Sequence, residues 1–555
     1  MIKLSKRIVS LGLILVCLFS FIGCSNKNNN SDGGNSNNDT TIQDGSTNTV
    51  VEQTIYNIEY YIDKNLYTTQ KIVAGENAPK PTNPTKAGYT FLGWYKDELL
   101  TNEFDFDSEI TKNRKLYSKW QIDENAIGDL PVVYINTQDG VFPQDKKNYI
   151  NCSFEIQNCE NEEYNMSVEM TSKSDLEADP SVKQNCGVRL RGNSTSSFAK
   201  KPFRIKFDAK KKSLFGLTAA KSWVLLADYM DQSSIRNYSA FNFAGILDET
   251  SYTPSANHVV LYFNGEYMGL YLLTEQVDEK EGRNNVEAEE HMLAATSETK
   301  DFAFQIEFDR YALTEGTTGV DNFATTFQPV EIKYPEYDER NIPEGSEDYV
   351  FNYIQEYVNA VLHLLEYGGT TTVSFEDEPV KLEDLLDVDS FIDYCLINEL
   401  MFNQDNTWGS ICASKKVGEP MKFGPVWDFD WSCSDTYTGK PYTNAFNHCA
   451  TDFVSFKFNT PYHDFALNEE HFEDICERWN EISADVESFV QTYLYDYKFY
   501  LNDAAKYDAN YWYGETGSFQ YQMQYDYVRL FLLDRIEFFN SVFVSGNFEE
   551  FRKMI

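Results

Sequence analysis

The sequence is poor in positive charge. Its 555 residues include 47 Lys and Arg against 87 Asp and Glu, which gives a formal net charge of −40. A chain this acidic repels the phosphates of DNA and RNA, which excludes a general nucleic-acid-binding function. No apolar run after residue 23 is long enough to cross a bilayer, so no integral membrane protein is expected. Cys-x-x-Cys pairs are also absent, which argues against a zinc site.

The first fifty residues predict where the protein is located. Lys3, Lys6 and Arg7 precede an apolar run over 8–22, as in a signal peptide covering 1–23. The following Cys24 stands where a bacterial lipobox places its lipidated cysteine, although an ordinary signal peptide is the alternative. Residues 24–50 are rich in Asn and Ser and predict a disordered tether. We therefore expect an extracytoplasmic protein held at the bacterial cell surface by a lipid anchor.

Eight cysteines remain beyond Cys17 and Cys24, and an exported protein could oxidise them. Cys152 with Cys159 is the pair that we expect to form a disulfide. Cys395 lies in an apolar helical pattern and is expected in the core.

Residues 51–121 predict a small β module. Alternation over 54–62, 88–95 and 114–120, with polar turns between these segments, indicates three or four strands. The segment resembles the Listeria–Bacteroides repeat, which implies a β-grasp-like module of bacterial surface proteins, without catalysis. We expect a spacer or a weak adhesive module with its own surface ligand. The matching pieces are G-Y-T-F-x-G-W-Y at Gly88–Tyr95, F-D-F at Phe104–Phe106 and L-Y-x-K-W at Leu116–Trp120.

The chain from 130 to 555 begins with strands, expected at 131–135, within 150–175 and at 186–191. A polar loop at 192–197 then leads into a strand in which Arg204 and Lys206 share one face, because side chains alternate. Backbone N–H groups of such a loop can hold a phosphate. A polar hairpin on the surface is the alternative.

Further along, two strands over 258–263 and 266–273 flank Asn264-Gly265, the preferred pair for a type I′ hairpin turn. Apolar spacing predicts helices at 346–366 and within 469–505 and 518–545.

Residues 387–432 are the most informative stretch. Asp387 or Asp389 caps a helix that ends near Phe402 and carries Glu399 on its apolar face. That carboxylate must be paired, functional or turned to solvent. A loop with Asp405 follows, and then a hairpin over 410–427 leads to Asp428-Phe429-Asp430. Two acidic clusters joined by a hairpin suit a divalent cation beside a general base. Two solvated acidic loops are the alternative.

This order resembles a protein-kinase active site, in which an Asp after a helix orients the substrate hydroxyl and an Asp after a hairpin binds magnesium. Gln404 and Ser410 depart from the usual residues, and no G-x-G-x-x-G loop exists. The departures are those of the CotH kinase family, which the chain resembles in six segments: Arg191–Thr195, Lys201–Phe207, Trp223–Asn237, Tyr262–Glu275, Asn398–Asp405 and Gly424–Ser432.

The resemblance implies an α+β, atypical protein-kinase-like domain with a β-rich N-lobe and a helical C-lobe. It also implies transfer of the ATP γ-phosphate to Ser-containing protein with Mg²⁺ (or Mn²⁺). Asp405 would be the catalytic-loop carboxylate, and Asp428 would bind the metal, with Asp430 or Ser410 as a further ligand. Arg236 and Asn237 are expected to be structural, with a phosphate contact as the alternative. Lys206 would be the second catalytic residue and would contact the ATP phosphates. The other predicted nucleotide contacts are Arg191, Gly192, Asn193 and Ser194, with Glu275 either at the adenine side or paired with Lys206.

Three functional interpretations remain. The first is a surface-anchored protein serine kinase. The second is a non-catalytic lipoprotein that uses the CotH fold for adhesion or coat assembly. The third, which the acidic clusters alone support, is a structural domain that binds a divalent cation.

Overall fold

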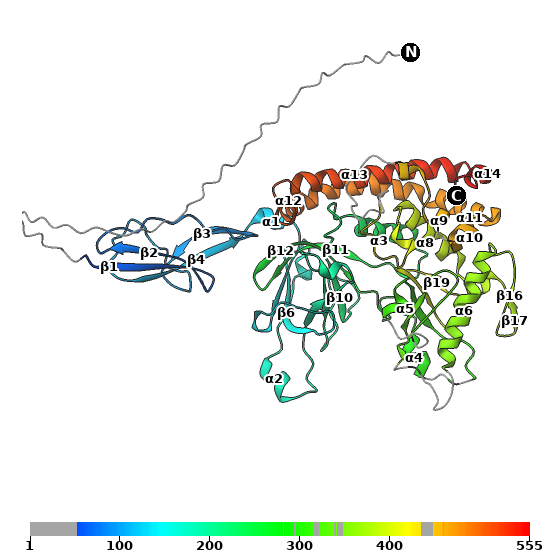
Figure 1. The fold of residues 1–555 in the computed structure, drawn as a ribbon, viewed down its shortest axis with the longest axis horizontal. Helices are drawn as coiled ribbons and strands as arrows, with labels where there is room; N and C mark the ends of the chain where they lie inside the picture. The colour runs from blue at the N-terminus through cyan, green and yellow to red at the C-terminus, as the bar shows by residue number, and fades with distance from the viewer. Residues whose placement is uncertain are drawn as a thin grey trace, which may run out of the picture.

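The computed structural model describes residues 53–280, 282–293, 296, 298–315, 321–337, 340, 348–433, 448–458 and 460–555. The predicted signal peptide, Cys24 and the tether lie outside the described residues. Figure 1 shows a small β module joined to a larger body, in which two long helices run above the other elements.

The β module contains four strands in the order β2-β1-β4-β3, with β1 and β4 parallel. Its core packs around the buried Tyr60 and Trp94. The three strands expected from alternation are confirmed. β2 gave no such signal because most of its side chains are exposed or half-buried. The strands are β1 Ile55–Ile62, β2 Asn65–Val73, β3 Tyr89–Tyr95 and β4 Arg114–Ile122.

A short helix, α1 (Glu124–Ile127), leads into a closed barrel. The strand order is β5-β11-β12-β10-β9-β8-β6-β7, and β6 also pairs with β5, so that seven strands form a ring. Its interior is filled by buried side chains such as Phe154, Phe203 and Trp223. The strands are β5 Val132–Thr137, β6 Ile150–Gln157, β7 Met166–Val168, β8 Gly187–Leu190, β9 Phe203–Lys206, β10 Ser222–Leu226, β11 Ala256–Phe263 and β12 Glu266–Glu275.

Two local predictions in the barrel have opposite outcomes. Asn264 and Gly265 have φ of 51° and 77°, as a type I′ turn requires, so the hairpin is confirmed. The Cys152–Cys159 pair is wrong. Cys152 lies in extended β6 and Cys159 follows that strand, which separates the two α carbons by about 20 Å. The Cys152 sulfur lies instead 3.5 Å from that of Cys186.

A second sheet, in the order β14-β15-β13-β18-β19, begins the helical region. Helix α6 (Tyr349–Glu366) is confirmed, and α8 (Val388–Leu400) begins after Asp387, whose side chain accepts from the Ser390 N–H. The predicted hairpin is β18 paired with β19. The strands are β13 Phe304–Phe308, β14 Asn322–Phe323, β15 Val330–Tyr334, β18 Ile411–Lys415 and β19 Lys422–Phe423.

The C-terminal helices are α11 (Glu469–Ser488), α12 (Leu494–Tyr513) and α13 (Gly517–Phe539), as their apolar spacing predicted. In Figure 1, α12 lies above the barrel, and α13 continues along the top of the larger body toward α14. The remaining elements are α2 Lys173–Ala178, α3 Arg236–Leu247, α4 Ala288–Leu293, α5 Ala312–Glu315, β16 Val373–Phe375, β17 Glu378–Val380, α7 Leu382–Leu385, α9 Ser455–Phe458, α10 Thr460–Ala466 and α14 Phe548–Phe551. A β-rich first part and a helical second part are therefore confirmed.

Candidate active site

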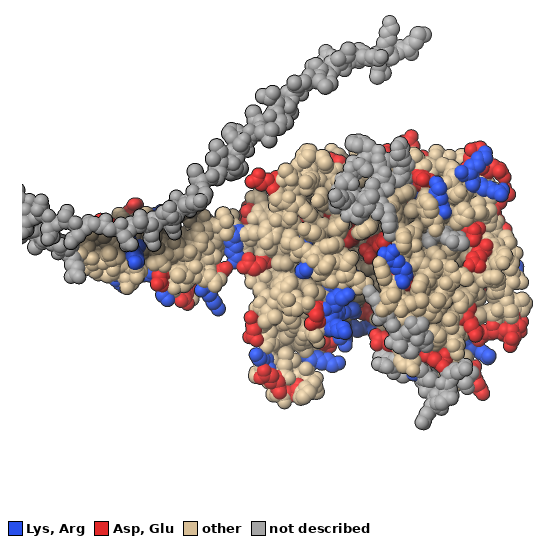
Figure 2. All heavy atoms as spheres, in the orientation of Figure 1, with Lys and Arg blue, Asp and Glu red and all other residues tan. Residues whose placement is uncertain are grey.

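A cleft of about 1420 Å³ lies between the barrel and the second sheet. Although the chain is strongly acidic, basic side chains gather in this hollow, where Figure 2 shows them as a group. The basic residues of the lining are Lys146, Arg189, Arg191, Lys200, Arg204, Arg310 and Lys333. The described lining also contains nine Asp and Glu residues, so the cleft places a basic group that suits an anionic ligand beside an acidic group that suits a cation.

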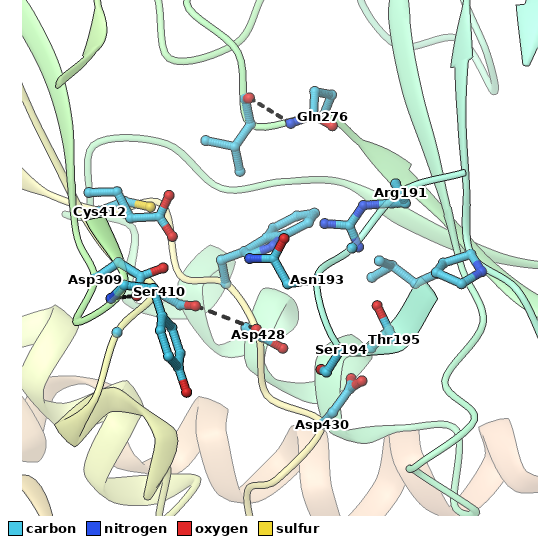
Figure 3. Close-up of a pocket in the computed structure, with 18 of the residues that line it drawn as sticks. Arg191, Asn193, Ser194, Thr195, Gln276, Asp309, Ser410, Cys412, Asp428 and Asp430 are labelled. Carbon is cyan, nitrogen blue, oxygen red and sulfur yellow. Dashed lines mark hydrogen bonds between the residues drawn. The ribbon is translucent and has the colours of Figure 1, made fainter. Parts of the chain in front are cut away.

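The barrel wall carries Arg191 and the loop Gly192–Thr195 directly after β8. Gly192 has φ of 80°, and a Cβ there would come within 2.0 Å of the Thr195 hydroxyl, so only glycine fits. The Lys146 ammonium donates to the Asn193 side-chain oxygen at 2.9 Å. Figure 3 shows Arg191 and this loop on one side of the cleft. The predicted phosphate loop therefore lines the cavity.

The opposite wall carries the predicted carboxylates. Asp405 begins the turn after α8, and Asp428 follows the β18–β19 hairpin. The Ser410 hydroxyl donates to Asp428 Oδ2 at 3.4 Å, as Figure 3 shows. Ser410 and Asp428 have φ of 57° and 66°, in the left-handed region. Such strained backbone at non-glycine residues is characteristic of functional sites.

The cleft carboxylates have raised pKa values. Burial and the nearby Asp428 raise the pKa of Asp405 to about 7. Burial and Asp231 raise that of Asp228 to about 7, and burial with Asp228 and Asp428 raises the pKa of Asp430 well above its ordinary value. Burial also raises the pKa of Asp428, against the opposing effect of Arg191. These carboxylates therefore repel one another, and a cation between them would relieve that repulsion.

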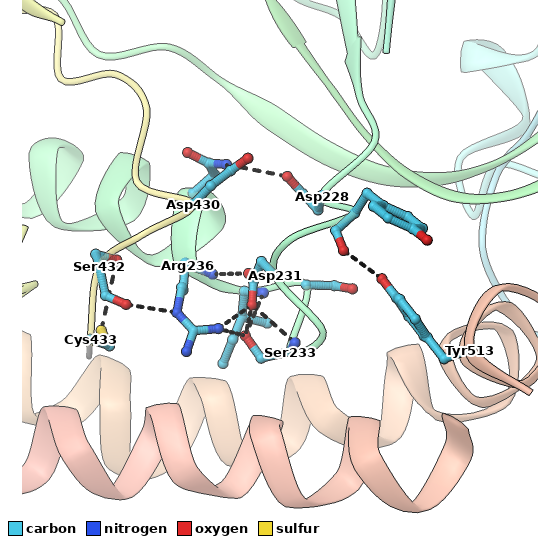
Figure 4. A network of polar contacts seen from close by, with 12 residues as sticks. Asp228, Asp231, Ser233, Arg236, Asp430, Ser432, Cys433 and Tyr513 are labelled. Carbon is cyan, nitrogen blue, oxygen red and sulfur yellow. Dashed lines mark hydrogen bonds and ion pairs between the residues drawn. The ribbon is translucent and has the colours of Figure 1, made fainter. Parts of the chain in front are cut away.

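A polar network supports the floor of the cleft (Figure 4). The Asn237 amide donates to Asp228 Oδ1 at 3.2 Å and to Asp430, and its oxygen accepts from the Phe429 N–H at 2.9 Å. Fully buried Arg236 pairs with Asp231 and donates to the Ser432 carbonyl. Arg236 has the structural contacts expected of it, whereas Asn237 also lines the cleft.

The sequence interpretation assigned no role to Asp228 or Arg204 and expected Asn237 to be structural, but all three line the cleft. A signal for Asp228 was present, since an acidic residue follows the wholly buried strand β10. Asn237 had no comparable signal because two of its three partners, Asp430 and Phe429, are more than 190 residues away in sequence.

Two predicted nucleotide contacts lie outside the lining. The Lys206 ammonium pairs with Asp208 at 3.0 Å and lies over the Tyr149 ring. Glu275 is buried and pairs with Arg283 at 3.2 Å, not with Lys206. The structure brings together the other predicted site residues: Arg191, Gly192, Asn193, Ser194, Asp405, Ser410, Asp428 and Asp430.

Glu399 is paired, which settles the alternatives left by the sequence. It is fully buried, accepts from the Val454 N–H at 2.9 Å and lies 3.5 Å from Arg535. Burial raises the pKa of Glu399 to about 7 despite Arg535. Cys395 is in the core, as expected.

The donor chemistry of the cleft fits magnesium and a nucleoside triphosphate. Among the described residues, no three His, Cys, Asp or Glu side chains are arranged to hold a metal ion by themselves. Magnesium commonly takes one or two carboxylates and fills its remaining positions with water and phosphate oxygens. Asp428, with Asp430 or Ser410, can supply the protein ligands, and the facing Arg191 and Gly192–Thr195 loop suit phosphates.

Residues 188–539 match the model of the CotH kinase protein family. This chain belongs to the CotH kinase family. Residues 56–119 match the Listeria–Bacteroides repeat domain, so the module before the CotH kinase domain is also confirmed.

Two curated relatives come from Evansella cellulosilytica. They are described as "Putative membrane protein" and "Putative Gly-rich membrane protein". Each is 44% identical over 54 residues, which is 10% of this chain and 8% and 6% of the relatives. The described part of this chain has no helix with the length and hydrophobicity of a membrane span.

Proposed function

We propose that this CotH-family protein is a serine kinase that transfers the ATP γ-phosphate to protein with the help of Mg²⁺ or Mn²⁺. The observation that carries the proposal is that Asp405 and Asp428 line the same cleft as Arg191 and the Gly192–Thr195 loop; Figure 3 shows Asp428 facing Arg191 and this loop. Phosphoryl transfer depends mainly on positioning and charge stabilisation, and this cleft offers both.

Each wall has its own task. Arg191 and Arg204 would bind the phosphates, and the N–H groups of the loop would orient them. Arg204 lies on β9 two residues before Lys206, the cation predicted from the sequence. Asp428, with Asp430 or Ser410, would hold the cation, which neutralises charge on the phosphates when bound. Asp405 would accept the proton of the substrate hydroxyl, and a pKa of about 7 suits a general base at neutral pH.

We also propose that the protein acts outside the cytoplasm, attached to the membrane through a lipid on Cys24. The predicted signal peptide and tether support this location. The names of the two Evansella relatives are in keeping with it. A Ser-rich protein at the cell surface would then be the substrate.

The test uses the purified full chain with γ-labelled ATP, Mg²⁺ or Mn²⁺ and a Ser-rich acceptor protein. We expect label transfer that is lost in Asp405→Asn and Asp428→Asn and kept in Asp503→Asn, which changes an exposed carboxylate on α12. Calorimetry should show metal-dependent ATP binding in Asp405→Asn and none in Asp428→Asn. A parent protein that neither transfers label nor binds ATP with metal contradicts the proposal and favours an adhesive or coat-assembly role.

A further inference from the structure

Two cysteines face each other inside the barrel. In the β6–β8 pairing Asn151 lies opposite Gly187, so the next pair along is Cys152 and Cys186. The Cys152 N–H donates to the Cys186 carbonyl at 3.0 Å, which confirms that register. Their sulfur atoms are 3.5 Å apart, and both side chains are fully buried.

This geometry is close to that of a disulfide. Directly opposed residues of an antiparallel pair have α carbons about 4.5–5.5 Å apart, and disulfides span about 4.4–6.8 Å. The sulfurs must approach by about 1.5 Å to reach the bond length of about 2.0 Å, which small rotations of the two side chains supply. No backbone movement is needed.

We propose that Cys152 and Cys186 form a disulfide when the chain folds under oxidising conditions. Both S–H bonds break and one S–S bond forms, while two electrons and two protons pass to a disulfide oxidant, which becomes two thiols. Oxidised glutathione or the disulfide of a thiol oxidoreductase can serve. In the cell the bond depends on the export proposed above, because cytoplasmic thiols are kept reduced.

Bond formation belongs to folding rather than to the finished protein. Neither sulfur is accessible once the barrel has closed. Burial and the neighbouring Cys152 also raise the pKa of the Cys186 thiol, so the reactive thiolate is scarce in the folded state. Exchange therefore takes place while β6 and β8 pair.

The bond would close a loop over residues 153–185, which includes β7 and α2. The base of this loop is already held by polar contacts, since the Asn185 N–H donates to the Thr171 hydroxyl at 2.7 Å and the Asn151 amide donates to the Thr171 carbonyl at 2.7 Å. A cross-link there restricts the unfolded chain and stabilises the barrel. It also anchors the start of β8, the strand that leads to Arg191 in the cleft.

The test refolds the full chain in a glutathione redox buffer, blocks free thiols with iodoacetamide in denaturant and maps the peptides by mass spectrometry. We expect a cross-link between the Cys152 and Cys186 peptides that disappears on reduction. Reductant should lower the midpoint of thermal unfolding by about 5–10 °C. Cys152→Ser and Cys186→Ala should have that lower midpoint without reductant, whereas Cys395→Ser should keep the cross-link.

Folded parent protein in which both cysteines carry the iodoacetamide label overturns the proposal, as does a cross-link from Cys152 to any other cysteine. The mapping is made on the parent chain, so a variant that fails to fold does not affect the result. No step measures phosphate transfer, so failure of the kinase proposal and failure of the disulfide proposal are distinguishable.

Discussion

The pKa of Asp405 links one residue to the pH dependence of catalysis. The carboxylate must be ionised to accept a proton, and its pKa is raised to about 7, first by burial and then by Asp428. A cation bound to Asp428 weakens the effect of the Asp428 charge on the pKa of Asp405 and leaves the effect of burial unchanged. We therefore expect kcat/KM to follow the ionisation of one group with an apparent pKa at or just under 7. It should rise about tenfold per pH unit below that pKa and level off above it.

The measurement is the pH profile of label transfer at saturating metal. Asp309→Asn is the informative control, because Asp309 also raises the pKa of Asp405. Its limb should move to lower pH. A profile that is flat from pH 5 to 8 in the parent would show that Asp405 is not the base.

Asp228 predicts an effect on stability instead. Its side chain is 8% exposed, and burial with Asp231 raises its pKa to about 7, above that of the unfolded chain. The stability it contributes is present below about pH 4 and is lost as the pH rises through 7. Asp228→Asn keeps the acceptor for Asn237 and removes the charge. Without metal, this variant should be more stable than the parent by about 2–4 kcal/mol at pH 8, with a smaller gain at pH 5.

Chemical denaturation at the two pH values tests this expectation, with Asp503→Asn as the exposed control. If Asp228→Asn changed the free energy of unfolding equally at both pH values, the charge of Asp228 would not be the cause of the lost stability. The repulsion among these carboxylates is a stability loss of the kind that functional sites tolerate.

At the scale of elements, the periodic spacing of apolar residues predicted most helices and the hairpins. It could not predict which strands far apart in the sequence pair with one another. Helix α8 and the Asn264-Gly265 turn depend on neighbours in sequence, so their residues suffice. The closed barrel depends on β5 pairing with β6 and, in parallel, with β11, more than 120 residues away. No local pattern encodes that choice.

Local sequence patterns likewise predicted only part of the candidate site. Alternation correctly placed Arg204 and Lys206 on one face of β9, with apolar side chains on the other. It could not show that only Arg204 reaches the cleft. Lys206 is the last residue of the strand, and its ammonium is drawn to Asp208. Asp405 and Asp428 were predictable because a single hairpin brings them together.

Contact between the barrel and α12 predicts different effects for two glycines of one hairpin. Gly265 and Gly269 both have positive φ, but a Cβ meets nothing at Gly265 and comes within 1.9 Å of Asp508 Oδ1 at Gly269. Asp508 accepts from the Leu270 N–H at 2.8 Å and pairs with buried Lys200. Gly265→Ala should destabilise by about 1 kcal/mol, and Gly269→Ala by about 3 kcal/mol or more.

Equilibrium unfolding in urea gives both values. Equal losses would mean that the backbone conformation alone matters and that α12 does not depend on this contact.

Helix α13 is joined to α8 by a fully buried ion pair, Arg535 with Glu399. Arg535→Met leaves a buried carboxylate without its cation and should destabilise by about 3–5 kcal/mol. Adding Glu399→Gln should recover part of that loss, which a double-mutant cycle measures. Lys553→Met, at an exposed pair with Glu550, is the control and should have no measurable effect. Strictly additive losses would contradict the coupling.

At the scale of the whole molecule, the repeat module and the CotH kinase domain meet at a small contact. The Tyr262 hydroxyl donates to the Gly88 carbonyl at 2.8 Å, and the Gly88 N–H donates to the Tyr507 hydroxyl at 2.8 Å. The Tyr89 hydroxyl donates to the Gly265 carbonyl at 2.9 Å. No described residue of the module lines the cleft. In the surface location proposed above, the module should therefore position the domain without taking part in the proposed phosphate transfer.

A substitution at Gly88 can test the contact between the module and the barrel separately from the folding of the module. It has φ of 75°, and a Cβ would come within 2.7 Å of Tyr267, whereas Gly75 has φ of 86° and open space around it. Both Gly88→Ala and Gly75→Ala strain the module, but only the first also presses against the barrel. Gly88→Ala should increase the radius of gyration in small-angle scattering and expose the link near α1 to proteases, while label transfer stays unchanged. If both variants gave the same scattering and cleavage, the contact at Gly88 would not hold the module in place; if Gly88→Ala lowered transfer, the module would act on the cleft after all.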